Sequence, residues 1–379
     1  MKHRLRIMRF QDFETPDPRA ATMILLGFLV GVAAIELLVG GHFEATNSNA
    51  FDDCYRVSES AATLDELVRR VADAKRAGST TLVLIGGSTA YGASGGPDET
   101  ISCHLQHRFT EVNASSVRVY NLAADGNRPT DDYLVFKAIN AHADYIVVSA
   151  YYGWFQIPQA GGDGLEYVAH PEYTFLPNVV DADSAGMAAP AHGEKKAEYF
   201  FDSLARGISV YRNRQLIQQA IFGDSPEEKP RQLLRWLQCA AFGRCALARY
   251  TAFTDKPEQT RLTILASPEL KLAPLANESL VPLKYWRRMA HESEGRLFFY
   301  FSPHNPALHG MESTNYSANV RAAERVVTEA GGGFYAPQAR NLGLEPSDYT
   351  DTMHTLDNGN RAVAEALHQE LTARFKGLN

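Results

Sequence analysis

Short apolar runs that alternate with amphipathic segments constrain the fold of this chain more than any other feature. Residues 81–85 (TLVLI), 115–126 and 144–153 contain runs that are too short for helices and rich in strand formers. Residues 63–78 and 130–143 carry apolar side chains at helical spacing. Because strands that alternate with helices run parallel, the sequence predicts an α/β fold, with a parallel sheet and helices on its faces.

The same alternation resumes near the C-terminus after a long interruption. Four further elements are expected there: a strand within 295–303, a helix within 317–331, a strand within 332–337 and a helix at 360–375. Residues 156–294 begin with a stretch rich in Gly, Pro and Ala and continue with helical segments, the last near 280–292. We therefore expect one sheet domain made of residues 63–155 and 295–379, interrupted by an insertion or lid at 156–294.

Residues 20–41 form an apolar stretch in which Glu36 is the only charged residue. At 1.5 Å per residue, a helix of this length crosses a hydrocarbon core of roughly 30 Å. Five Lys and Arg residues precede it within residues 1–19, whereas none follows until Arg56. The positive-inside rule predicts a single-pass anchor with a cytoplasmic tail at 1–19, a linker at 42–62 and the body outside the cytoplasm. A cleaved signal peptide and a buried core helix are the alternatives.

Charge and motif content argue against several function classes. The formal net charge of −7 and the pI of about 6.0 argue against a nucleic-acid binder. No G-x-x-x-x-G-K-[ST] loop is present, so nucleotide phosphate binding is not indicated. His104 and His107 have no acidic partner at a familiar metal-site spacing, so we predict neither a metal nor a cofactor. Cys239 and Cys245 could pair in an oxidising compartment, and free, buried thiols are the alternative for all four cysteines.

Four residues are candidates for nucleophilic catalysis. Ser88 follows the first strand directly, in LVLIGGSTAYG, and ligands of a parallel sheet gather at the carboxyl ends of its strands. A serine needs a base, and His354 is the candidate, with Asp351 three residues earlier to orient the ring. Gly126 follows the second strand, where its backbone N–H could stabilise an oxyanion. A helix-capping Ser88 and an ordinary turn glycine are the alternative interpretations.

Taken in order, the blocks GGSTAYG, NLAADG, VVSAYYG and DTMH make this chain similar to the SGNH, or GDSL, hydrolase family. The resemblance implies a three-layer α/β sandwich of the flavodoxin-like type. It also implies a serine esterase in which Ser88, Asp351 and His354 are the catalytic residues. By the same resemblance, the N–H groups of Ser88 and Gly126 hold the oxyanion, and no metal or cofactor takes part.

The third block departs from the family pattern. It usually reads G-x-N-D, and here Phe155 occupies the position of the Asn whose amide is an oxyanion donor. Gln156 and Asn127 are the candidate replacements, because each lies next to a residue of a matching block. Loss of one such donor costs about 10²–10³ in turnover. A slow esterase, a transferase and an inactive binder are all consistent with this departure.

Other residues near these blocks are candidates for a pocket or a nucleophile. Aromatic and glycine residues around the first and third blocks are expected to line a substrate pocket, with core packing as the alternative: Tyr91, Tyr152, Gly153 and Trp154. Ser94, in GASGG, matches the G-x-S-x-G nucleophile elbow of another hydrolase fold. That motif needs its serine directly after a strand, whereas Ser94 lies nine residues beyond Ile85.

Together, these features predict an esterase or deacetylase anchored in the inner membrane, with its catalytic domain in the periplasm. It would act through an acyl-enzyme on O-acyl groups of envelope polysaccharide or lipid. One alternative is an O-acyltransferase that modifies an exopolysaccharide together with a membrane acyl-donor protein. Another is an inactive envelope scaffold or glycan binder. The acyl group and the oligomeric state are not indicated by any residue pattern.

Overall fold

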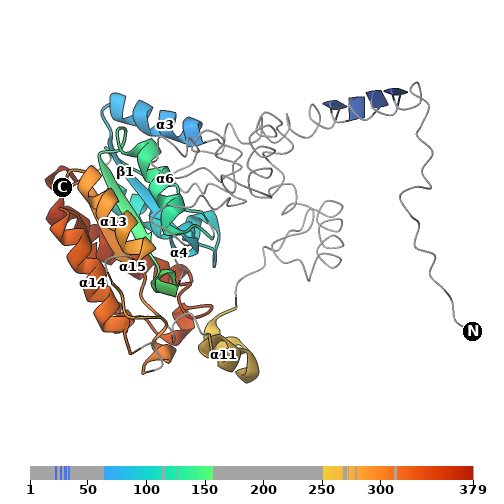
Figure 1. Cartoon of the computed structure of the whole chain (residues 1–379), viewed down its shortest axis with the longest axis vertical. Coiled ribbons are helices and arrows are strands. Elements are labelled where there is room, and N and C mark those ends of the chain that lie inside the picture. Colours follow the sequence, from blue (N-terminus) through green and yellow to red (C-terminus); the bar gives the residue numbers. More distant parts are fainter. Residues whose placement is uncertain are drawn as a thin grey trace, which may run out of the picture.

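Five parallel strands form the sheet of the computed structural model, within the part of the chain that it describes. They are β1 (Thr80–Gly86), β2 (Val117–Asn121), β3 (Tyr145–Ala150), β4 (Leu297–Phe301) and β5 (Gly333–Tyr335). Their order across the sheet is β2-β1-β3-β4-β5, and every neighbouring pair runs parallel. Figure 1 labels β1 together with helices of the same domain, among them α6, α13 and α14. The predicted parallel α/β fold is therefore confirmed. The order reverses between β1 and β3, which makes that point a topological switch.

Helices cover both faces of this sheet. One hydrophobic core lies between the sheet and α3 (Leu64–Arg76), α6 (Pro129–Ile139), α13 (Val281–Glu292) and α14 (Tyr316–Glu329). A second core lies between the sheet and α5 (Ile101–Glu111) and α15 (Asp357–Arg374). Successive side chains of β1 alternate between the two, with Val83 and Ile85 in the first core and Leu82 and Leu84 in the second. The described part is thus a three-layer sandwich.

The structure describes residues 64–112, 116–124, 126–156, 251–267, 273–277, 280–310 and 314–378, together with residue 271 and eight positions between 22 and 34. The remaining described elements are short: α4 (Ser88–Tyr91), α11 (Glu258–Leu265), η4 (Pro97–Glu99), η5 (Tyr152–Gln156), η8 (Phe253–Asp255), η9 (Pro306–Leu308), η10 (Ala339–Leu342), η11 (Pro346–Asp348) and η12 (Lys376–Leu378). The predicted tail, the linker and residues 157–250 of the predicted insertion lie outside the described residues, so those domain boundaries stay predictions.

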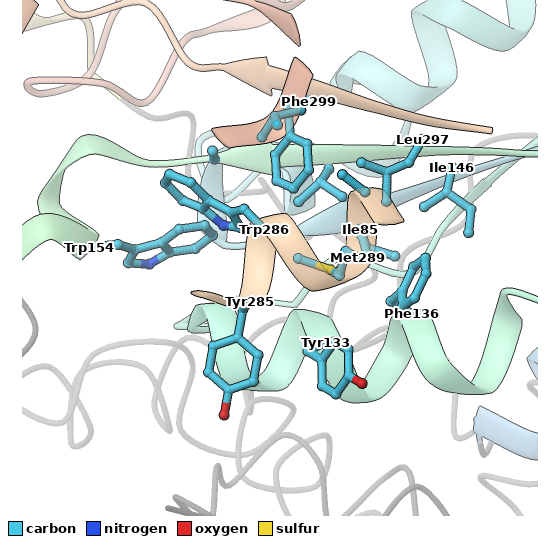
Figure 2. Packing of buried hydrophobic residues seen from close by; sticks show 14 of the residues in the cluster. Ile85, Tyr133, Phe136, Ile146, Trp154, Tyr285, Trp286, Met289, Leu297 and Phe299 are labelled. Atoms are coloured by element: carbon cyan, nitrogen blue, oxygen red, sulfur yellow. The ribbon is translucent and has the colours of Figure 1, made fainter. Parts of the chain in front are cut away.

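Helix α13 falls within the segment predicted as an insertion, yet it belongs to the helical layer of the sheet. Its Trp286 is fully buried, and the centroid of the Trp286 ring lies 5.7 Å from that of Phe299 on β4. Figure 2 shows Trp286 between Trp154 and Phe299, with Met289 of the same helix packed nearby. The sheet domain therefore already includes α13 and does not resume only at residue 295.

The predicted anchor is largely untested by the structure. In the part of the chain that is described, no helix combines the length and the hydropathy needed to span a bilayer. Most of residues 20–41 lie outside that part. The eight described positions within this stretch are all helical and exposed, including Met23, Leu26 and Val30.

The placement of α13 predicts that Trp286→Ala lowers the free energy of unfolding by about 3–5 kcal/mol, because it leaves a large cavity against β4. His291→Ala, at an exposed position of the same helix, should change it by less than about 0.5 kcal/mol. Urea unfolding of the full-length protein, followed by circular dichroism, measures both. Equal effects of the two substitutions would place α13 outside the core.

Candidate active site

Ser88 lies at the carboxyl end of β1, at the switch point of the sheet. It is the first residue of α4 and is partly exposed. β1 ends at Gly86, whose φ of +148° is a conformation that residues with a side chain rarely adopt. A Cβ at Gly86 would lie 2.8 Å from both the Cβ and the carbonyl oxygen of Ser149 on β3. Only glycine therefore allows β1 to approach β3 this closely and then turn into the helix that carries Ser88.

Three buried hydroxyl groups fix the residue that follows the serine. Thr89 Oγ1 lies 3.2 Å from Ser149 Oγ, and Ser149 Oγ lies 3.3 Å from Ser302 Oγ. Ser302 in turn donates to Thr89 Oγ1 at 3.0 Å. Each hydroxyl can both donate and accept, so the three satisfy one another in a closed ring. This ring ties α4 to β3 and to the residue just after β4.

Asp351 and His354 lie in a closed loop that precedes α15. Tyr349 and Thr355 form an antiparallel bridge across its base, and the N–H of Thr350 donates to the carbonyl oxygen of His354 at 2.9 Å. Inside the loop, Asp351 Oδ1 accepts two backbone N–H bonds of 2.9 Å, one of them from His354. This turn, in which a side chain caps its own backbone, holds the Asp351 carboxylate beside the imidazole.

The structure brings Ser88, His354 and Asp351 into one chain of hydrogen bonds. His354 Nε2 lies 2.6 Å from Ser88 Oγ, although the two residues are 266 positions apart. His354 Nδ1 lies 2.7 Å from Asp351 Oδ2. Because a carboxylate can only accept, Nδ1 carries the ring proton and Nε2 accepts the hydroxyl proton of Ser88. A nucleophile, a base and a carboxylate that orients the base are thus within reach of one another.

The electrostatics of Asp351 suit this arrangement. Burial on its own raises the pKa of this carboxyl, but the hydrogen bond and charge of His354 and two backbone N–H bonds lower it by more. The net result is a pKa below the ordinary value of 3.8. Asp351 is therefore ionised at neutral pH and able to stabilise a protonated His354.

Asn305, which no sequence motif indicated, positions the loop of Asp351. Its side chain is buried and donates to the carbonyl oxygen of Asp351 at 2.8 Å. Its backbone N–H donates to the carbonyl oxygen of Thr352 at 2.9 Å. Asn305 follows β4, so the end of a central strand supports the acid. The sequence signal was a polar residue two positions after the predicted strand at 295–303.

Two backbone N–H groups are available near the serine. Ser88 is the first residue of α4, where a helical N–H has no acceptor within its own helix. Gly126 is exposed, its φ is +77°, and its N–H has no hydrogen-bond acceptor among the described residues. A positive φ favours glycine at that position. Neither N–H group predicted as an oxyanion donor therefore has an acceptor among the described residues.

Phe155 occupies the core and not the site. It is 1% exposed, and its ring packs edge-on against Trp286 with 5.8 Å between centroids. Of the two candidate replacement amides, Asn127 is buried and its Nδ2 donates to Asp132 at 3.2 Å. Gln156 ends η5, and the placement of its side chain lies outside what the structure describes. No side-chain donor therefore comes from position 155.

The predicted pocket residues lie in different environments. Trp154 lies beside the turn that precedes the serine, because its ring is 3.5 Å from the place of a Cβ on Gly87. Tyr152 is buried, and its hydroxyl accepts from Asn319 Nδ2 at 3.2 Å. Gly153 is buried between them. Tyr91 is 9% exposed and packs in the core with α5, as the alternative interpretation expected.

The rival candidates form other contacts. Ser94 is buried beyond α4, and its Oγ lies 3.4 Å from that of Thr350. His104 Nε2 pairs with Asp357 at 2.7 Å, which links α5 to the start of α15. Cys103 belongs to a disulfide whose partner lies outside the described residues. Cys239 and Cys245 also lie outside the described residues, so their predicted pairing stays a prediction.

His304 is a buried, neutral histidine close to the candidate site. It is 8% exposed, and neither ring nitrogen has a hydrogen-bond partner in the described part of the chain. Its ring packs against the rings of Tyr152 and Tyr316, with centroids 5.8 and 5.0 Å away. Burial lowers its pKa from 6.5 to about 4. Its neighbour Asn305 contacts the loop of Asp351.

Comparisons with known proteins add little to this geometry. No family model and no curated protein matches the sequence. Among solved structures, a crystal structure of TesA aligns with 43% of this chain and 99% of its own, at 14% identity and a TM-score of 0.19. A TM-score this low supports no conclusion about fold or function.

The burial of His304 predicts a pH-dependent loss of stability. Below pH 6.5 the unfolded chain binds a proton that the folded chain does not bind until pH falls to about 4. The free energy of unfolding of wild type should therefore fall by up to about 3 kcal/mol relative to that of His304→Phe as pH decreases through this window. His309→Phe, which replaces an exposed histidine nearby, is the control for the substitution itself. Urea unfolding at several pH values tests this, and parallel curves for all three proteins would contradict it.

Proposed function

We propose that this chain is a serine esterase of the SGNH type that works through an acyl-enzyme. The observation that carries the proposal is the contact of His354 Nε2 with Ser88 Oγ at 2.6 Å, with Asp351 behind the ring at 2.7 Å. The order of the sequence blocks supports the same family. The partial exposure of Ser88 and His354 leaves the reacting oxygen accessible to a substrate.

The reaction follows from these contacts. Ser88 Oγ bonds to the carbonyl carbon of an ester while its proton passes to His354 Nε2, and Asp351 stabilises the imidazolium. The N–H groups of Ser88 and Gly126 hold the negative oxygen of the tetrahedral intermediate. His354 then gives its proton to the departing alcohol. Water, deprotonated by His354, hydrolyses the acyl-enzyme and releases the acid.

The proposed location is the outer face of the inner membrane. The apolar stretch at 20–41 supports an anchor, and the disulfide of Cys103 supports an oxidising compartment such as the periplasm. An enzyme anchored there meets O-acyl groups on envelope polysaccharide or lipid, which we propose as its substrates. Transfer of the acyl group to a sugar hydroxyl, with a membrane acyl-donor protein, would use the same acyl-enzyme.

Substitution of the serine tests the reaction. Full-length protein in detergent should hydrolyse 4-nitrophenyl acetate, and Ser88→Ala should lower kcat by at least about 10³-fold because the nucleophile is gone. Ser94→Ala is the matched control and should keep wild-type activity. Loss of activity in Ser94→Ala alone would reassign the nucleophile. Equal activity in wild type and Ser88→Ala would remove the proposal.

The pH profile tests the base. His354 must be neutral to accept a proton, so kcat/KM should fall as pH decreases through about 6–7, where an ordinary imidazole gains its proton. Initial rates between pH 5 and 8, as round limits set by that value, measure this dependence. A flat profile would argue against His354 as the base.

An acceptor distinguishes hydrolysis from transfer. If a polysaccharide added to the esterase assay becomes acylated faster than acid is released, the chain is an acyltransferase. If acid release is unchanged and no acylated polysaccharide forms, the chain is a hydrolase. Mass spectrometry of the polysaccharide and of the Ser88 peptide reports both products.

A further inference from the structure

Helix α5 begins at the outer edge of the sheet, beside β2. Among the described strands β2 is an outermost one. Gln106 of α5 binds its backbone, with Oε1 2.7 Å from the N–H of Val119 and Nε2 3.1 Å from the carbonyl oxygen of Val117. Asn121, the last residue of β2, donates to Ser102 Oγ at 2.9 Å. The first turns of α5 therefore lie at this edge, at the carboxyl end of the strands.

Helix α3 reaches the same edge on the opposite face of the sheet. It packs against β1 and α6, and α6 in turn packs against α13, so α3 is at the β2 end of its helical layer. Lys75, near the end of α3, pairs with Asp144 at 2.8 Å, just before β3 begins. The 13 residues of α3 span about 20 Å, close to the length of the seven-residue strand β1. Its start at Leu64 therefore lies at the carboxyl end of the strands.

Cys103 lies on a flank of α5 that a segment outside the described residues covers. α15 packs on the flank of α5 that carries His104 and Arg108. At about 100° per residue, Cys103 lies on another flank, between His107 and Thr110. These two neighbours are exposed, yet Cys103 is 0% exposed and belongs to a disulfide. Because no other cysteine is described, the covering segment must carry the partner.

Three cysteines are possible partners: Cys54, Cys239 and Cys245. Cys239 and Cys245 are separated by five residues, and closing so short a loop costs less entropy than closing a long one. Their mutual bond leaves Cys54 for Cys103. The chain after Cys245 also leads elsewhere, because the N–H of Phe253 donates to the carbonyl oxygen of Tyr349 at 2.6 Å, next to α15.

The length of chain before α3 fits a bond between Cys54 and Cys103. Residues 55–63 separate Cys54 from the start of α3, and an extended segment of this length spans at most about 30 Å. The starts of α3 and α5 lie on opposite faces at one edge, two layer spacings of roughly 10 Å apart. The segment is therefore long enough to pass from α3 around the end of β2 to α5.

We propose that Cys54 forms a disulfide with Cys103 and that residues 54–63 dock at the edge of the sheet beside the carboxyl end of β2. The two thiols pass two electrons and two protons to the disulfide of a thiol–disulfide oxidoreductase, which leaves as a dithiol. This step needs the oxidising compartment proposed above, but it does not depend on the esterase reaction. The docked segment shields an edge strand, whose backbone groups otherwise offer pairing to other chains.

The same bond shortens the tether to the proposed membrane anchor. Cys54 follows residue 41, the end of the apolar stretch, by 13 positions, which span at most about 45 Å. Cys103 lies at the end of the sheet that carries Ser88. The disulfide therefore keeps this end of the sheet close to the membrane surface, where acyl groups of envelope lipid or polysaccharide are found.

Peptide mapping without reduction identifies the partner of Cys103. Full-length protein in detergent, with free thiols blocked by N-ethylmaleimide, is cut with trypsin and Asp-N. We expect residues 53–56 joined to 98–108, and residues 236–244 joined to 245–249. A peptide that joins Cys103 to Cys239 or Cys245, or an alkylated Cys54, would overturn the inference. The measurement needs no activity, so a failure of the esterase proposal would leave its result unaffected.

Hydrogen exchange tests where the segment docks. Cys54→Ser, Cys103→Ser and their double variant should accelerate amide exchange at residues 101–106 and 117–121 to the same extent, because each removes the same bond. Exchange in α14 should stay at the wild-type rate, which verifies folding. The matched control, Cys239→Ser with Cys245→Ser, should leave residues 117–121 unchanged. Unchanged exchange there in the double variant of Cys54 and Cys103 would overturn docking at the β2 edge.

Reduction replaces these variants if Cys103→Ser does not fold. Dithiothreitol added to the folded Cys239→Ser and Cys245→Ser protein breaks only the bond of Cys103. It should accelerate exchange at residues 101–106 and 117–121 and release two thiols that N-ethylmaleimide labels at Cys54 and Cys103. Labelling of neither cysteine under these conditions, or exchange that does not change, would contradict the proposal.

Discussion

The close parallel pairing of β1 with β3 is the constraint on which the rest of this site depends. It is possible only because Gly86 has no side chain, since a Cβ there would lie 2.8 Å from Ser149. The pairing places the end of β1 at the switch point of the sheet, where chains leave in opposite directions and side chains can meet. The hydroxyl ring of Thr89, Ser149 and Ser302 then fixes the turn against β3 and the end of β4. Ser88 therefore has a defined position before its base is considered.

Helix packing positions the base, His354, which lies near the C-terminal end of the sequence. α15 packs against α5 on the second face of the sheet. The loop before α15 contacts Ser88, which follows β1, and Asn305, which follows β4. Within that loop, backbone bonds to Asp351 Oδ1 set the carboxylate, and Asn305 secures the loop to the end of β4. The triad geometry is thus the joint result of one local turn and two long-range contacts.

Two residues with unpaired buried polar atoms are sequence neighbours of site residues, since His304 precedes Asn305 and Asn127 follows Gly126. His304 has no partner for either ring nitrogen, and Asn127 and Asp132 each lack one, within the described residues. A fold selected for stability alone would pair such groups or replace them with apolar ones. Locally unfavourable features of this kind persist mostly at functional sites.

The sequence by itself determined the alternating strands and helices, the position of Ser88 after the first strand and the pairing of Asp351 with His354. These depend on periodicity and on spacings of a few residues, which local backbone geometry fixes. Only the tertiary structure decided that α13 joins the sheet domain, that Phe155 is core and that Asn305 supports the acid. Each of these depends on which distant surface a side chain is buried against. No local sequence pattern identifies the packing partner of an apolar residue, because the same residue could be buried in a lid or in the core of the sheet domain.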